Sequence, residues 1–154
     1  MTTMDDPSRK HDTSRQIAAP LLLSVIVCDS VILDRFTGKA TVVGVFSAIN
    51  ARQYPARHHS LTVFCEMTGG HGPIPVAARL IDLQNDEEVV VQQTVQVEFP
   101  NPLVVNVVVL NFRGIPLPHP GEYRFQIYAG GEYCGERRIV CREVEAGSGG
   151  VPNE

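Results

Sequence analysis

The segment VVVQQTVQVEF, residues 89–99, decides the fold, because it carries the clearest periodic pattern in the chain. Apolar residues alternate with polar ones, which is typical of a β-strand with one buried face. Only Gln93 breaks the pattern among the inward positions. The expected inward residues are Val89, Val91, Val95, Val97 and Phe99, and the expected outward residues are Gln92, Thr94, Gln96 and Glu98. We therefore expect a protein built from sheets.

Similar segments recur on the N-terminal and C-terminal sides, at the spacing of a short strand plus a turn. LTVFCEM (61–67) and GEYRFQIYAG (121–130) alternate in the same way, and the turn TGK (37–39) joins LLLSVIVC (21–28) to TVVGVFSAI (41–49) as a hairpin. We count eight strands, no convincing helix and no connection long enough for a βαβ unit. These features predict an all-β protein with an antiparallel β-sandwich.

The segment that follows residues 89–99 differs in character. LVVNVVVLNF (103–112) is apolar on both faces apart from its two asparagines, which is typical of a strand covered on both sides. It is expected either to lie centrally beneath a loop or to meet a second copy of the protein. RGIPLPHPG (113–121) carries three prolines and is therefore expected to be a loop rather than a paired strand.

The stretch LLLSVIVCDS (21–30) allows two interpretations. Basic residues precede an apolar run that ends at Cys28, as in an exported lipoprotein anchored at that cysteine. Against export stand Val27 where a small residue is needed, acidic residues in the leader, and Pro20 within the run. We interpret the stretch as the first strand, with export as the alternative. One buried face is expected at Leu21, Leu23, Val25 and Val27, and the other face at Leu22, Ser24, Ile26 and Cys28.

Length and composition are those of one globular domain. The chain has 154 residues and a net charge of -4, so no broad positive field attracts nucleic acid or an anionic membrane. We expect neither partner, and we expect a cytoplasmic protein. Its four cysteines are too scattered for a disulfide framework and are expected to be reduced and buried. The sandwich is expected at residues 17–144, between disordered tails at 1–16 and 145–154.

Two stretches together resemble an uncharacterised bacterial family of small β-sandwich proteins. They are CDSVILDRFTGKATVVGVF (28–46) and PHPGEYRFQIYAGGEYCGE (118–136). The resemblance spans residues 20–143 and implies an immunoglobulin-like sandwich of bacterial origin, with no activity, cofactor or partner to transfer. The matching positions are Cys28, Asp29, Thr37, Gly38, Lys39, Gly44, Phe46, Pro120, Gly121, Tyr123 and Phe125.

Candidate catalytic and metal-binding residues lack the patterns that such chemistry needs. His58 and His59 are adjacent, so on an extended chain they point to opposite sides, and we interpret His71 and His119 as exposed loop residues. The GGHG turn precedes no helix that could bind phosphate, and no Gly-x-Ser-x-Gly elbow occurs. Asp29 is expected to cap a turn. We expect no enzyme, no metal and no cofactor.

Two surface features support a protein that acts through contacts. The connection ARQYPARHH (51–59) is either a solvated loop or gathers basic side chains that hold an acidic partner. The apolar loop IPLP (115–118) either folds over the open end of the sandwich or is a second contact surface. We expect an unidentified protein partner, and a homo-oligomer through sheet edges or through residues 103–112. A module that binds a small ligand or carbohydrate between its loops is the alternative. The candidate contact residues are Arg52, Tyr54, Arg57, His58, His59, Ile115 and Leu117.

Overall fold

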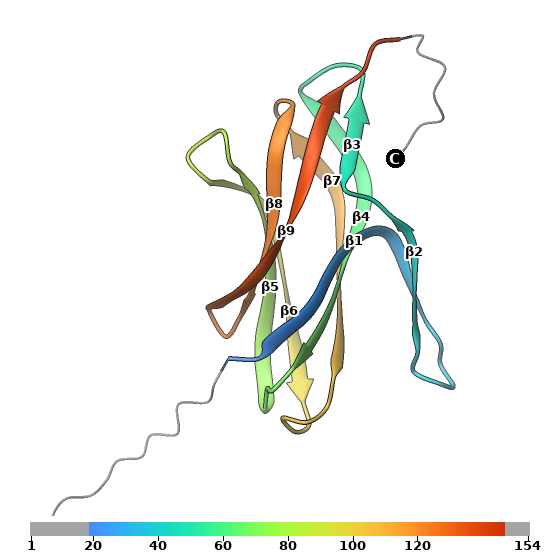
Figure 1. Ribbon diagram of the computed structural model, residues 1–154, viewed down its shortest axis with the longest axis vertical. Coiled ribbons are helices and arrows are strands. Elements are labelled where there is room, and N and C mark those ends of the chain that lie inside the picture. Colours follow the sequence, from blue (N-terminus) through green and yellow to red (C-terminus); the bar gives the residue numbers. More distant parts are fainter. Residues whose placement is uncertain (1–18, 147–154) are drawn as a thin grey trace, which may run out of the picture.

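The computed structural model describes residues 19–146, and nine β-strands form two facing sheets there (Figure 1). No helix occurs in this part of the chain, so none is available to cross a membrane. The predicted tails lie outside the described residues, except for residues 145 and 146. The strands are β1 (Leu21–Leu33), β2 (Ala40–Val45), β3 (Ala48–Ala51), β4 (Ala56–Thr68), β5 (Gly72–Asp82), β6 (Glu88–Phe99), β7 (Asn106–Leu117), β8 (Gly121–Ala129) and β9 (Glu132–Glu143).

The two sheets have the orders β2-β1-β4-β7 and β3-β9-β8-β5-β6. The prediction of an all-β, immunoglobulin-like sandwich is confirmed, and two details differ from it. The segment expected to be one strand at 41–49 divides at Phe46, where the chain leaves the four-stranded sheet and enters the five-stranded one. The new strand β3 then pairs with β9 in parallel, so the sandwich is not wholly antiparallel.

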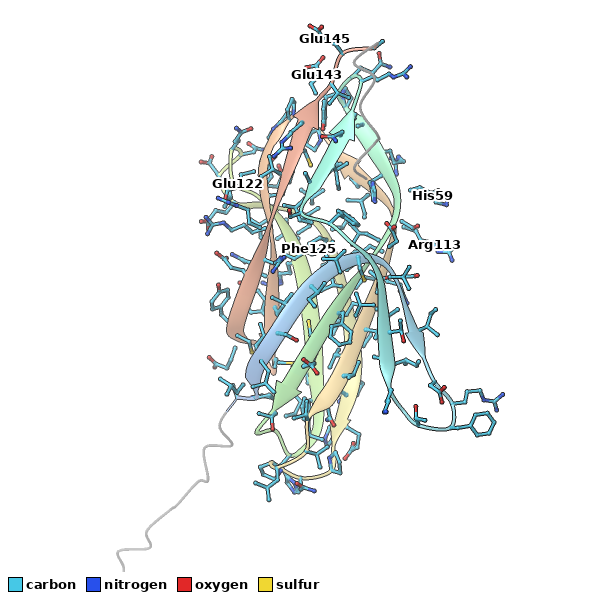
Figure 2. The ribbon with its side chains drawn as sticks, turned by 45° about the vertical axis from the view of Figure 1, so that its right-hand side comes forward. His59, Arg113, Glu122, Phe125, Glu143 and Glu145 are labelled. Carbon is cyan, nitrogen blue, oxygen red and sulfur yellow. The ribbon has the colours of Figure 1, made fainter. Side chains whose placement is uncertain are left out.

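The core lies between the two sheets and takes its side chains from alternate positions of the strands. Phe125 of β8 is fully buried and lies inside the sandwich in Figure 2, with its ring centroid 5.2 Å from that of Phe112 on β7. Burying one such side chain stabilises the fold by about 1.5–3 kcal/mol. The twelve largest fully buried side chains are Tyr123, Phe99, Phe125, Leu61, Met67, Leu80, Leu110, Ile115, Leu117, Ile127, Ile139 and Val27.

Strand β1 forms where predicted, but the expected assignment of its faces is wrong at the N-terminal end. Leu21 and Leu23 are 61% and 49% exposed, while Leu22 packs against the core. The cause is a register shift against β4 between Leu22 and Ser24, since one extra residue reverses which side chains face inward. From Val25 onward the predicted face points to the core.

Strand β6 shows the same effect at its start. Its pairing with β5 shifts between Leu80 and Ile81, so that Val90 packs against the core and Val89 is 46% exposed. The predicted inward positions beyond the shift are confirmed, since Val91, Val95 and Val97 pack against the core and Phe99 is fully buried. The sequence pattern thus identifies the strand correctly, and the irregular pairing changes one position.

The proline-bearing segment expected to be a loop belongs instead to β7. Arg113 to Leu117 pair with the first residues of β4, so that residues 56–59 also lie in a strand rather than in a connection. Because β7 ends the four-stranded sheet, Pro116 sits on an edge strand, where proline is tolerated. This edge position also replaces the central one considered for residues 103–112, of which the first three precede the strand.

Candidate functional site

The β1–β2 hairpin projects away from the body of the sandwich (Figure 1). Its turn is ordered by Asp34, whose Oδ1 accepts hydrogen bonds from the backbone N–H groups of Phe36 and Thr37, both at 2.8 Å. The same hydrogen bonds lower the pKa of the Asp34 carboxyl group. Across the turn the Asp34 N–H donates to the Lys39 carbonyl at 2.9 Å, and Gly38 adopts a φ of 70°. The hairpin is therefore a defined structure.

The projecting hairpin exposes large apolar side chains. Phe36, at the tip, is 99% exposed, although an aromatic ring of this size is normally covered in a folded protein. The strands that lead to the tip continue the apolar surface. These further side chains are Ile32 (58% exposed), Leu33 (54%), Val43 (40%) and Val45 (57%).

The base of the hairpin is set by Asp29 and Gly44. Gly44 adopts a φ of 69°, and a Cβ atom added there would lie only 2.2 Å from Oδ2 of Asp29. The backbone conformation therefore favours glycine, and a side chain at this position would also have to displace the Asp29 carboxylate. Asp29 lies within β1 and does not cap a turn, contrary to the prediction.

Cys28, the proposed lipid-anchor position, is fully buried in the middle of β1. Its Sγ lies 3.5 Å from the carbonyl oxygens of Ser30 and Thr62. The strand residues before it, Leu21–Val27, pair with β4. An anchored chain beginning at Cys28 would lack this half of the strand.

A pocket of about 540 Å³ lies between the start of β4, the β5–β6 turn and the end of β7. Most of its wall is apolar, and the polar side chains at the wall belong to acidic and basic residues and one asparagine. Among the described residues that line it there is no serine, threonine or cysteine. The lining residues are Pro55, Ala56, Arg57, Asp82, Asn85, Glu88, Val89, Val90, Pro116, Leu117, Pro118 and His119.

His119 and the buried Asp82 form an ion pair at the wall of this pocket. The His119 Nε2 atom lies 2.5 Å from Oδ2 of Asp82, and its Nδ1 lies 2.8 Å from the Pro120 carbonyl oxygen. A carbonyl oxygen only accepts hydrogen bonds, so Nδ1 carries a proton and donates it. The hydrogen bonds to Pro120 and Asp82 raise the pKa of His119. His119 lies in a loop as expected, but it is only partly exposed and is held by these two partners.

Tyr123 holds the backbone next to this ion pair. Its hydroxyl donates a hydrogen bond of 2.7 Å to the His119 carbonyl, four residues upstream, and the two rings stack with centroids 5.6 Å apart. A tyrosine that bonds back across the corner between two strands in this way is a hallmark of immunoglobulin-like sandwiches. Burial of the ring raises the pKa of Tyr123 to about 12.

The sequence-predicted contact residues do not form one surface. Ile115 and Leu117 are 0% and 1% exposed and belong to the core, so the prediction of an apolar contact loop is wrong for both. They face inward because residues 113–117 continue strand β7. His58 also turns inward, and its ring centroid lies 5.7 Å from that of Phe46.

The remaining predicted contact residues lie near one end of the sandwich. Tyr54 is half-buried, and its hydroxyl donates to the Arg142 carbonyl at 2.9 Å. Arg57 donates to the Gly114 carbonyl at 2.8 Å. His59 is exposed and points outward beside Arg113 (Figure 2), and Arg52 is exposed on the preceding connection. Only Arg57 reaches the pocket.

Sequence reasoning missed two features. Phe36 could have been found, because it is the only aromatic residue in the polar turn DRFTGK (34–39). The pairing of His119 with Asp82 joins residues 37 positions apart and had no local signal. Among the described residues, no group of three histidine, cysteine or acidic side chains is placed to hold a metal ion.

Comparisons with known proteins yield a family and distant structural neighbours. A model described as "Family of unknown function (DUF6941)" matches residues 23–141. No curated protein matches. Among solved structures, an immunoglobulin-like protein from Pseudomonas aeruginosa is 12% identical, with a TM-score of 0.38, and the alignment covers 82% of this chain and 99% of that one.

Two larger proteins are also similar in structure. The alkylpurine DNA glycosylase AlkC from Pseudomonas fluorescens is 9% identical with a TM-score of 0.45, over 62% of this chain and 27% of that one. A β-glucosidase from Listeria innocua is 11% identical with a TM-score of 0.42, over 79% of this chain and 16% of that one. This chain thus spans only a small part of both proteins.

Proposed function

The chain belongs to the DUF6941 family, a family of unknown function, and from its own geometry we propose a non-catalytic module that binds other protein chains through the β1–β2 hairpin. The observation that carries this proposal is the 99% exposure of Phe36 at the tip of an ordered turn. A phenylalanine buries about 150–250 Å² in an interface, and aromatic side chains are enriched at such contacts. The unfavourable exposure of the Phe36 ring to water is explained if a partner chain covers the ring.

The proposal of a non-catalytic role rests on the pocket beside His119. A histidine paired with a buried carboxylate needs a nucleophile or a substrate proton within hydrogen-bonding reach to act as a base. Both ring nitrogens of His119 already face the Asp82 carboxylate and the Pro120 carbonyl. We place the module in the cytoplasm, where reduced thiols such as its four free cysteines persist.

Photo-cross-linking in the native cell tests the role of the hairpin. A photoreactive phenylalanine analogue in place of Phe36 is expected to give discrete adducts with protein, since the tip contacts a partner. The matched control places the same analogue at Tyr133, an aromatic residue that is 53% exposed on β9. Excess wild-type protein should suppress the adducts, and excess Phe36→Ser protein should not. Identical adduct patterns at positions 36 and 133 would contradict the proposal.

A second candidate function is the binding of a small ligand or carbohydrate in the pocket of about 540 Å³, whose volume lies in the usual range for such sites. NMR titration with simple sugars and organic acids should then shift resonances of His119 and its neighbours. Val89→Trp, which places a large ring at the mouth of the pocket, should abolish those shifts. Resonance shifts that persist in this variant, or that spread over the surface without preference for the pocket, would exclude ligand binding in the pocket.

A further inference from the structure

Strand β2 ends the four-stranded sheet and pairs only with β1 among the described strands. The hydrogen bonds at the tip show which of its backbone groups face outward. Lys39 faces β1, because its carbonyl accepts from Asp34 across the turn. Successive residues of a strand point their backbone groups to opposite sides, so Thr41 and Val43 also face β1. The N–H and C=O groups of Ala40 and Val42 therefore point to the free edge.

The break at Gly44 supports this assignment. Strict alternation would direct the backbone of residue 45 toward β1, whereas the N–H of Phe46 donates to the Val27 carbonyl at 3.1 Å. The extra residue is accounted for by the irregularity at Gly44, with its φ of 69°. The regular, open part of the edge is thus Ala40–Val43.

This edge lacks the protection that free edges of β-sheets usually have. Edge strands normally carry charged side chains or proline, or are covered by a loop, because open backbone groups pair with other chains. The sequence ATVVGV of β2 contains neither a charged residue nor proline. Within residues 19–146, its only protection is the irregularity at Gly44, which limits pairing without preventing it along the four preceding residues.

We infer that the partner of the hairpin is a second copy of this chain, joined by antiparallel pairing of β2 with β2 about a two-fold axis. This inference rests on the proposed function and names the partner of the same hairpin. In a two-fold interface the same surface must complement itself. Antiparallel pairing places the tip of each hairpin beside the base of the other, and their surfaces are complementary.

Charge complementarity supports this arrangement. The tip carries Arg35 and Lys39, and the base carries the exposed Asp29. None of these three side chains forms an ion pair within the described part of the chain. Lys39 shares a face of the hairpin with Ser30 and therefore points away from the face that carries Asp29. In the dimer Arg35 of each tip would lie near the carboxylate at the other copy's base, and each Phe36 would lie near the other copy's exposed Val45. The charged side chains would thereby gain ion-pair partners, and the exposed apolar side chains would be covered.

Sedimentation velocity on the full chain at micromolar concentration tests the inference. Wild-type protein is expected at twice the chain mass of 16.9 kDa. Val42→Pro removes an outward N–H and places a ring at the free edge, so this variant is expected to be a monomer. It should still fold, because that N–H bonds to nothing within the sheet. The matched control Val42→Ala keeps the N–H and should remain a dimer.

A charge exchange provides a second measurement if Val42→Pro fails to fold. Asp29→Lys and Arg35→Glu should each weaken the dimer several-fold, because like charges then meet at both ends of the interface. Mixing the two variants should restore association as a heterodimer, since every contact again joins opposite charges. An unchanged dimer in both variants would overturn the inference.

The remaining outcomes separate this inference from the proposed function. A monomeric wild-type protein whose Phe36 analogue still forms adducts with other proteins would refute the second copy as partner and leave the hairpin as a binding element. A wild-type dimer that persists in Val42→Pro would place the interface elsewhere. A monomeric wild-type protein whose Phe36 analogue forms no adducts would refute both the dimer and the proposed binding role of the hairpin.

Discussion

His119 is held by hydrogen bonds to three different residues of the sandwich. Its imidazole joins Asp82 on β5 to the Pro120 carbonyl before β8, while Tyr123 holds its backbone carbonyl. The His119 side chain is 33% exposed and the Asp82 side chain is 2% exposed. The buried Asp82 carboxylate therefore depends on His119 as its partner. We interpret this arrangement as a structural hydrogen-bond network that fixes the connection between β7 and β8.

The protonation of His119 should make stability depend on pH. Its pKa is raised in the folded protein, chiefly by the hydrogen bond to the Pro120 carbonyl and then by Asp82. The stabilisation is therefore fully present below the unfolded-state pKa of about 6.5 and is lost as the pH rises through the higher folded-state pKa. Urea unfolding across this range should show a decrease in wild-type stability that is absent in His119→Gln. Parallel curves for the two proteins would contradict the assignment.

At the scale of elements, the β1–β2 hairpin depends on two glycines that have nearly the same backbone conformation. Gly44 and Gly38 have φ values of 69° and 70°, but only Gly44 lies against another side chain, that of Asp29. Comparing substitutions at the two glycines therefore separates the free-energy cost of backbone strain from the cost of steric contact. A Cβ atom at position 44 would have to displace the Asp29 carboxylate, whereas a Cβ atom at position 38 would meet nothing within 4 Å.

Alanine substitutions should reveal this difference. Gly38→Ala is expected to cost about 1–2 kcal/mol, because alanine is strained at positive φ. Gly44→Ala should cost clearly more, because its Cβ must also displace the Asp29 carboxylate. Thermal unfolding of both variants provides the measurement. Equal losses would show that Asp29 moves aside freely.

The same scale shows how far the sequence predicts the fold. Alternation identified the strands around Val95 and Phe125, because a period of two is a local property. Local pattern cannot show where one strand slips against another, which is why Leu21 and Val89 were expected to be buried. The three prolines in 113–121 suggested a loop, since a sequence does not reveal that β7 is an edge strand. The His119–Asp82 pair was hidden for the same reason, because it forms only when distant segments meet.

At the scale of the whole molecule, the free cysteines report on how tightly the sandwich closes. Cys28, Cys65 and Cys141 are buried, whereas Cys134 on β9 is only half-buried. Burial raises the pKa of Cys65 and of Cys141 to about 12, so their reactive thiolate forms are scarce at neutral pH. The buried thiols should therefore not react while the fold is intact.

A thiol-specific reagent should modify Cys134 first in the native protein, and all four cysteines after denaturation. Mass spectrometry of the labelled protein would identify the modified sites. The variant Cys134→Ser should remain almost unlabelled under native conditions, because the other thiols react only when the sandwich opens. Rapid labelling of Cys65 in the folded protein would contradict the tight closure.

The short parallel pairing of β3 with β9 has a mechanical consequence. The hairpin precedes β3, and the C-terminal end of the described chain follows β9, so the two strands run in the same direction between these points. A pull between the hairpin and the C-terminal end would load the four paired positions of this ladder in shear. Their hydrogen bonds would then have to break together rather than one after another. A pull on a partner bound at the hairpin would thus load this ladder in shear rather than peel it open.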